Sequence, residues 1–184
     1  MPYITKEEFP SEYSDQVSKA MTAALNLLSY RMRTTFEIRS RIGDKFSPDI
    51  IEYVISKLVD QRYLDDTKFA QEWCDNRSKH KPRAKGLLKQ ELYKLGISDA
   101  DSDEALNAID DKVLAYDAGI KLAQRLLYKE TPSEIFNKKV QGLLHRRGFH
   151  TSTIIDAVRQ IKLDIGYVEP VSYTHLTLPT ILLV

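Results

Sequence analysis

The residues with the clearest capacity for chemistry are a run of cations between Arg77 and Lys94. This stretch contains seven Lys or Arg residues against one acid, Glu91. Clustered lysine and arginine side chains attract phosphates and acidic proteins, so the run predicts a contact surface for such partners. A solvated helix face is the commoner meaning of a charge run, and it stays open here. The candidate contact residues in the run are Arg77, Lys79, Lys81, Arg83, Lys85 and Lys89.

No residue pattern in the chain predicts catalysis. Neither common glycine-rich phosphate loop is present. The four histidines show no paired spacing, and with a single cysteine no zinc site is indicated. Asp65 and Asp66 are adjacent before a helix pattern, where carboxylates accept from unpaired N–H groups, so we interpret them as caps. We therefore expect no enzyme activity, no metal and no cofactor.

The composition is that of a soluble, helix-rich protein. Of the 184 residues, 29% are charged and 42% hydrophobic, with seven glycines and seven prolines. The formal net charge is only +1, so any attraction to polyanions must come from local clustering. The lone Cys74 indicates a reducing compartment and is interpreted as core. No signal peptide or membrane span is recognised, and we expect a cytoplasmic protein with no membrane partner.

Helix signals divide the chain into successive short helices. Ser47 and Pro48 predict one start, Pro82 another, and Thr131 to Glu134 a start with a capping box. Gly96 and Gly148 predict stops in the left-handed conformation. Residues 1–16 show no period and are interpreted as a flexible leader.

The order of three helices occurs three times. Ala24, Ala70 and Ala118 align at the first helix, and this alignment also brings together Arg31, Arg77 and Arg125. Before the third helix of each unit, Phe46, Ile97 and Phe149 align, followed by apolar residues at matching positions. We therefore predict an all-α fold, an elongated and curved array of three tandem three-helix repeats at residues 17–66, 67–112 and 113–166. Residues 167–184 fit no fourth repeat, and their β-prone apolar end predicts a non-native tail.

Stacked repeats would place cations of all three units along one extended face. Such a face suits an extended partner, and each neutralised phosphate would add salt-sensitive affinity. Tyr30, Tyr63 and Tyr93 lie near the basic runs, where they could stack on bases, although aromatic residues are more often core. The additional contact residues are Arg33, Arg39 and Arg41 in the first unit and Lys138, Lys139, Arg146 and Arg147 in the third.

Part of the sequence resembles the RecX family of bacterial regulators of the RecA recombinase. The segments RYLDDTKFAQEWCDNR and KPRAKGLLKQELYKLGI are similar to the family's central region, and the resemblance covers roughly residues 20–163. It implies a crescent of three three-helix units. The implied activity is binding to RecA along the groove of its nucleoprotein filament, which restrains filament growth, ATP hydrolysis and strand exchange. Lys81 stands where many relatives have glycine before the proline.

Two functions remain open from the sequence. The first is a regulatory protein whose partner is a RecA filament, with weaker, salt-sensitive binding to single- or double-stranded DNA. The second is a DNA-binding helical module that needs no protein partner. The first predicts inhibition at amounts well below the available DNA, and the second predicts that excess DNA abolishes inhibition.

Overall fold

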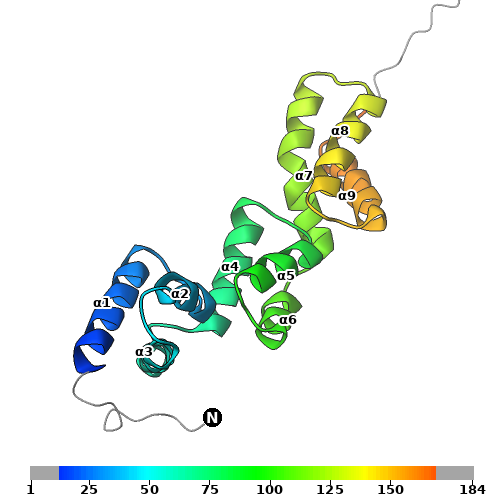
Figure 1. Cartoon of the computed structure of the whole chain (residues 1–184). Helices are drawn as coiled ribbons and strands as arrows, with labels where there is room; N and C mark the ends of the chain where they lie inside the picture. The colour runs from blue at the N-terminus through cyan, green and yellow to red at the C-terminus, as the bar shows by residue number, and fades with distance from the viewer. Residues whose placement is uncertain (1–12, 169–184) are drawn as a thin grey trace, which may run out of the picture.

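The computed structural model describes residues 13–168, and within them all regular structure is helical (Figure 1). The predicted all-α class is confirmed. The helices are α1 (Ser14–Tyr30), α2 (Thr35–Ile42), α3 (Pro48–Asp60), α4 (Asp66–His80), α5 (Lys85–Lys94), α6 (Asp99–Asn107), α7 (Asp111–Tyr128), α8 (Ser133–Arg146) and α9 (Thr151–Asp164).

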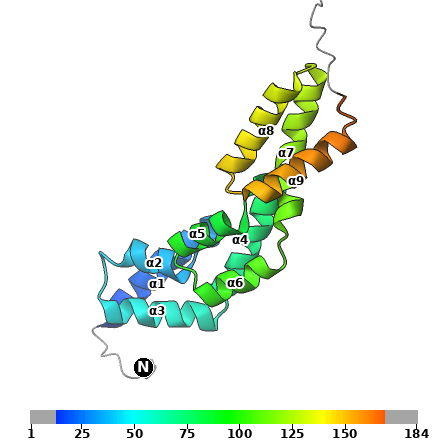
Figure 2. The ribbon, with the colours of Figure 1, turned by 90° about the vertical axis from the view of Figure 1, so that its right-hand side faces the viewer.

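The nine helices of this region form three units along one elongated body, as predicted (Figures 1 and 2). We call α1–α3 unit 1, α4–α6 unit 2 and α7–α9 unit 3. The third helices are amphipathic in the predicted register. Val54, Ala105 and Ala157 occupy equivalent buried positions, each close behind the N-cap of its helix. Burial of these apolar stripes is the main stabilising contribution, because most of the helices are too short to be stable alone.

The apolar core is divided into two parts. Unit 1 has its own buried cluster, which includes Ala20, Ile38 and Leu58. Units 2 and 3 share one continuous cluster, which runs from Phe69 to Ile161. Unit 1 is therefore joined to the rest of the molecule mainly by local contacts at its boundary with unit 2.

The predicted alignment of the first helices is correct only in part. Arg77 and Arg125 stand at equivalent places, because each lies four residues before the C-cap of its helix, Lys81 or Lys129. Arg31 is itself the C-cap residue that follows α1 and is equivalent to Lys81, the C-cap of α4. The alignment was wrong by about one turn in unit 1, since alanine recurs at helical spacing there and permits both registers.

The helix starts follow the sequence at most positions. Asp65 caps α4 by accepting from the Lys68 N–H, and Pro48 is the first residue of α3. The capping box predicted at α8 is wrong, since Pro132 is the N-cap there and no side chain caps the helix. The structure instead has a capping box at α2, where Thr34 and Glu37 satisfy each other's backbone N–H groups.

The boundary between units 1 and 2 is made of hydrogen bonds at helix ends. The buried Thr34 hydroxyl donates to the carbonyl of Leu95, the C-cap residue of α5, at 2.7 Å. The Thr35 N–H donates to Asp66 Oδ1 at 2.9 Å, and its hydroxyl donates to Oδ2 at 2.6 Å. Gly96, at φ +78°, lies against the ring of Phe36, where only a residue without a Cβ fits.

The boundary between units 2 and 3 repeats this arrangement. The Ala84 N–H donates to the carbonyl of Arg147, the C-cap residue of α8, at 3.0 Å. The Lys85 N–H donates to Asp111 Oδ1 at 2.9 Å, and Gly148, at φ +81°, lies against Leu87. The start of α2 thus lies at the end of α5, and the start of α5 lies at the end of α8. The helices α2, α5 and α8 therefore follow one another along the long axis (Figure 2).

The end of unit 3 includes Tyr167, the first residue of the segment predicted to be non-native. Its hydroxyl donates to the Thr131 carbonyl at 2.7 Å, and its ring lies 4.5 Å from that of Phe136. The Tyr167 N–H donates to the carbonyl of Lys162 as the Tyr63 N–H does to that of Leu58 after α3. Tyr167 thus belongs to the packed unit, and the predicted tail from residue 169 onward lies outside the described residues.

Candidate interaction surface

The predicted contact cations separate into paired and free residues. Those held by partners within the chain are Arg33, Arg39, Arg77, Arg83, Lys89 and Arg147. Within residues 13–168, no carboxylate lies within ion-pair distance of the remaining side chains. These free cations are Arg41, Lys79, Lys81, Lys85, Lys138, Lys139 and Arg146, all exposed except the half-buried Lys85.

Glu91 neutralises the most conspicuous part of the predicted basic run. Its Oε2 accepts from Trp73 Nε1 at 3.0 Å and from Arg77 Nε at 2.9 Å, and its Oε1 accepts from Arg83 Nη1. The Arg77 guanidinium also lies over the Trp73 ring, 4.5 Å from its centre. Arg77 and Arg83 therefore help to hold α4 against α5, and their contact with a partner stays a prediction.

Three further predicted contacts have structural roles. Arg39 forms a bidentate pair with Glu52 at 2.7 and 2.9 Å, and its hydrogen bonds lower the pKa of that carboxyl. Lys89 pairs with Asp103 at 2.5 Å, which explains part of the acidic start of α6. Arg147 Nη1 donates to the Pro82 carbonyl at 2.9 Å, and burial followed by the charge of Arg83 lowers the Arg147 pKa.

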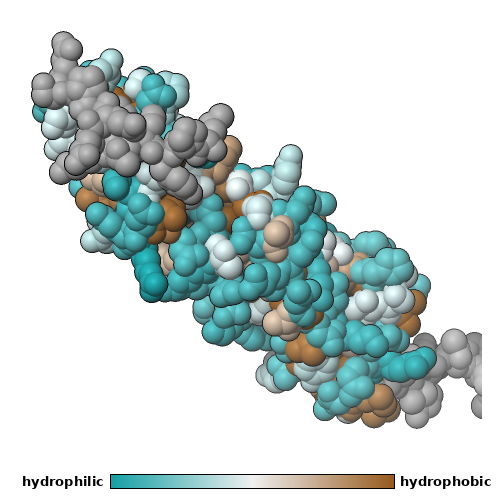
Figure 3. All heavy atoms as spheres, turned by 90° about the horizontal axis from the view of Figure 1, so that it is seen from below, coloured by the Kyte–Doolittle hydropathy of each residue, from teal (hydrophilic) through white to brown (hydrophobic). Residues whose placement is uncertain are grey.

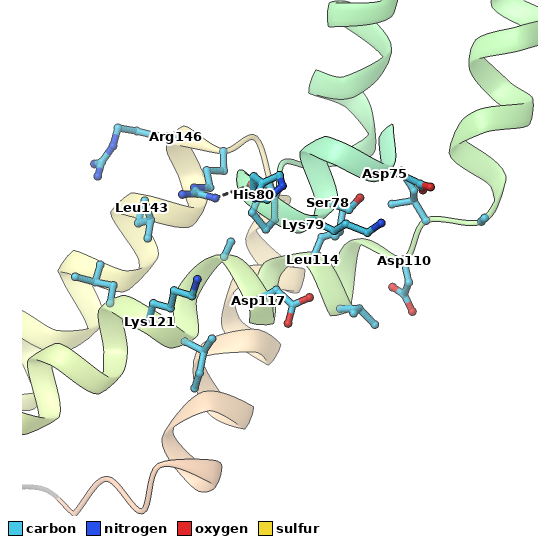
Figure 4. A pocket seen from close by; sticks show the side chains of 18 of the residues that line it. Asp75, Ser78, Lys79, His80, Asp110, Leu114, Asp117, Lys121, Leu143 and Arg146 are labelled. Carbon is cyan, nitrogen blue, oxygen red and sulfur yellow. Dashed lines mark hydrogen bonds between the residues drawn. The ribbon is translucent and has the colours of Figure 1, made fainter. Parts of the chain in front are cut away.

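A cleft of about 960 Å³ lies where the end of α4 meets α7 and α8 (Figure 4). Two predicted free cations, Lys79 and Arg146, line it together with His80. Lys121 and Arg125 of α7 also line it, and the sequence prediction omitted both. The sequence could have indicated them, because Arg125 is equivalent to Arg77 and unit 3 has no acid at the position equivalent to Glu91.

The charges along this cleft are segregated. The acids that line it are Asp75 of α4, Asp110, which is the N-cap of α7, and Asp117 in the first half of α7. Lys121 and Arg125 lie in the second half of α7. At 1.5 Å rise per residue, Asp110 and Arg125 are roughly 22 Å apart along the helix. The cleft therefore favours anions at its α8 end. Asp117 lies one turn of α7 from Lys121 but forms no ion pair with it in the described part of the chain, and Asp110 is too distant from Arg125 to neutralise it.

The exposed surface is largely polar, with single aromatic side chains projecting from it. Figure 3 shows one face of the body, over which hydrophilic residues predominate. Tyr30 is 84%, Tyr63 59% and Tyr93 76% exposed. The core interpretation of these tyrosines is wrong, and their rings are accessible to a partner. Trp73 of α4 is half-buried, and its indole N–H donates to Glu91 of α5.

The described residues contain no cluster of His, Cys, Asp or Glu able to hold a metal ion. None of their helices is long and apolar enough to cross a membrane. Cys74 is 2% exposed, and burial, followed by the charges of Asp75 and Glu91, raises its pKa to about 11. A neutral, inaccessible thiol is a poor nucleophile.

Cys74 is expected to react with a thiol reagent only after the protein opens. At pH 8 its labelling in the native state should be at least about a hundredfold slower than in urea, because the thiolate is scarce and enclosed. The rate is measured from the absorbance of the thiolate that the reagent releases when it reacts. All of this signal comes from Cys74, because it is the only cysteine in the chain. Equal rates in both states would contradict the assigned burial.

The fold and this surface define a helical-repeat protein with an elongated, cation-bearing body. Residues 20–58 match the first three-helix domain of RecX, and residues 65–106 match the second. The chain belongs to the RecX family.

Relatives and solved structures agree with this assignment. Regulatory protein RecX of Bacillus subtilis is 33% identical over 156 residues, covering 83% of this chain and 59% of that protein. Regulatory protein RecX of Chlorobium limicola is 29% identical, covering 78% of this chain and 90% of that protein. The crystal structure of RecX from Lactobacillus salivarius has a TM-score of 0.70 at 27% identity, covering 82% of this chain and 99% of that one. The chain thus spans only 59% of the Bacillus relative.

Proposed function

We propose that this chain is a regulatory protein that binds the RecA recombinase and its nucleoprotein filament. In this role it inhibits filament growth, ATP hydrolysis and strand exchange. Membership of the RecX family supports the proposal, because several relatives are named as regulatory proteins. The work is done by binding, and no catalytic group of this chain takes part.

The observation that carries the proposal is the repeated boundary between units. The same helix-end contacts join unit 1 to unit 2 and unit 2 to unit 3, so the chain forms a rod with an extended surface. Free cations occur in all three units, at Arg41, at Lys79 and Lys81, and at Lys138, Lys139 and Arg146. A rod of this kind matches a polymer better than a small molecule.

The test is a titration of the cognate recombinase with this protein in ATPase and strand-exchange assays. We expect inhibition at amounts far below those of the DNA, and we expect it to persist when unbound duplex DNA is added in excess. Loss of inhibition under excess DNA would instead favour the second function, a DNA-binding module without an obligatory protein partner. The exposed tyrosines are the observation that supports this alternative.

The double variant Lys79→Glu with Lys81→Glu should weaken inhibition about tenfold or more, because both side chains are exposed, unpaired and reversed in sign. Helicity by circular dichroism should not change. The half-maximal inhibitory amount in the ATPase assay measures the effect. Lys112→Glu with Arg159→Glu makes the same change of net charge at exposed residues of unit 3 and serves as the control. Equal losses in both variants would argue against a located contact.

A further inference from the structure

The last turns of α7 carry an exposed aromatic ring among cations. Tyr128 is 91% exposed. Lys121 and Arg125 precede it on the same helix face, and Lys129 follows it. These side chains and Gln124 line a hollow of about 650 Å³. We call Lys121, Arg125, Tyr128 and Lys129 the α7 strip.

The α7 strip occupies the place that a neutralised network occupies in unit 2. Counted back from the C-cap residues of the first helices, Lys81 and Lys129, Arg125 replaces Arg77 and Lys121 replaces Trp73. Counted from the N-caps of the second helices, Ala84 and Pro132, Lys139 replaces Glu91. Unit 3 thus has three cations, Lys121, Arg125 and Lys139, where unit 2 has an aromatic residue, an arginine and the carboxylate that both of them contact.

No acid compensates for this change. Within residues 13–168, neither Lys121 nor Arg125 forms an ion pair, although Asp117 precedes Lys121 by one turn of α7. Glu130 follows the strip in the turn after α7, also without an ion pair in the described part of the chain. The cations of the strip are therefore available to an external anion, and neutralising them would relieve their mutual repulsion.

Equivalent rings occur in the other two units. The first helices end at Tyr30, His80 and Tyr128, and all three of these side chains are exposed. The next residues are the cations Arg31, Lys81 and Lys129. Figure 1 shows α1, α4 and α7 running in the same general direction, so these ends lie toward one side of the body.

Unit 1 is the weakest of the three as an anion site. Arg31 is held by Glu37 through two hydrogen bonds, of 2.5 and 3.0 Å. Unit 2 offers an imidazole in place of the phenol ring. Unit 3 combines the most exposed ring with unpaired cations on both sides, so it is the strongest candidate.

We propose that the α7 strip binds single-stranded nucleic acid, with Tyr128 stacking on a base and Lys121 and Arg125 contacting phosphates. An exposed ring gains energy by stacking on an unpaired base, which a duplex does not present and an acidic protein surface does not contain. Cations at helical spacing, with Cβ atoms about 6 Å apart, suit a chain of regularly spaced charges. The inference deepens the proposed function, since it names a partner for part of the same surface.

The test is fluorescence anisotropy of a labelled oligothymidylate of about 16 nucleotides, titrated with the full chain over a range of salt concentrations. Tyr128→Ala should weaken binding about tenfold, whereas Tyr128→Phe, which keeps the ring, should bind like the wild type. Lys121→Gln with Arg125→Gln should reduce the magnitude of the slope of log K against log salt by about 1.4, since each phosphate contact contributes about 0.7.

Lys112→Gln with Arg159→Gln removes the same charge from unit 3 outside the strip and should leave the slope unchanged. The inference is overturned if the wild type does not bind the oligonucleotide, or if the strip variants bind it as the wild type does. It is also overturned if these variants lose only recombinase inhibition, because the strip would then contact protein. In that last case the proposed function would stand, so the two failures are distinguishable.

Discussion

Gly96→Ala is expected to lower the free energy of unfolding by about 2–5 kcal/mol. Gly96 has a φ of +78°, where an alanine costs roughly 1–2 kcal/mol. The added Cβ would lie 2.2 Å from Phe36 Cβ and 2.4 Å from its Cγ, so the boundary between units 1 and 2 must open or shift. Overpacking of this kind costs about 1–3 kcal/mol. Urea unfolding followed by circular dichroism measures the change.

Gly166→Ala is the matched control for the Gly96 variant. Gly166 has a φ of +62°, yet nothing lies within 4 Å of the position its Cβ would take. It should therefore show only the backbone strain, about 1 kcal/mol. Hydrogen exchange should also rise at the N–H groups of Thr35 and Ile38 in the Gly96 variant alone. Equal losses of stability in both variants would show that the contact with Phe36 contributes nothing.

Glu91→Gln is expected to cost about 2 kcal/mol of stability. The change removes the charge that neutralises Arg77 and Arg83, whose side chains are 25% and 39% exposed. Loss of one partner from a fully buried ion pair costs about 3–5 kcal/mol, and the partial exposure of both arginines lowers that figure. Trp73 is the only tryptophan and donates to Glu91, so its fluorescence should also change.

Glu52→Gln provides the comparison for Glu91. Glu52 also forms a close pair with an arginine, but its side chain is 58% exposed and that of Arg39 is 45% exposed. Exposed pairs contribute about 1 kcal/mol or less, so this variant should lose little stability and leave Trp73 fluorescence unchanged. A loss at Glu52 as large as that at Glu91 would contradict the role assigned to the half-buried network.

The fold was predictable because its signals are local. The period of Ile51, Val54 and Leu58 defines α3, and the same period returns in α6 and α9. Gly96 and Gly148 were predicted as stops and do adopt positive φ. The boundaries between units were not predictable, because the bond from Thr34 to Leu95 joins residues far apart in the sequence.

The candidate surface was predictable only as a count of charges. The sequence shows one acid among seven cations, which indicates a strongly basic run. It does not show that α4 and α5 bring Arg77 and Arg83 onto that one acid. Likewise, Lys121 and Arg125 lie outside the densest run, and they are available because neither forms an ion pair with any residue that the structure describes. Which cations form ion pairs depends on the tertiary structure and cannot be inferred from the amino-acid composition.

The division of the apolar core has a mechanical consequence. Units 2 and 3 share one buried cluster, so bending between them would expose hydrocarbon to water. Unit 1 keeps a cluster of its own, and its contacts with its neighbour include a few hydrogen bonds and the packing of Phe36 against Gly96. Hydrogen bonds to helix ends can be exchanged for bonds to water at small net cost. Bending of the molecule is thus expected mainly at the joint between units 1 and 2, and the proposed contact with a filament would allow unit 1 to adjust to its partner.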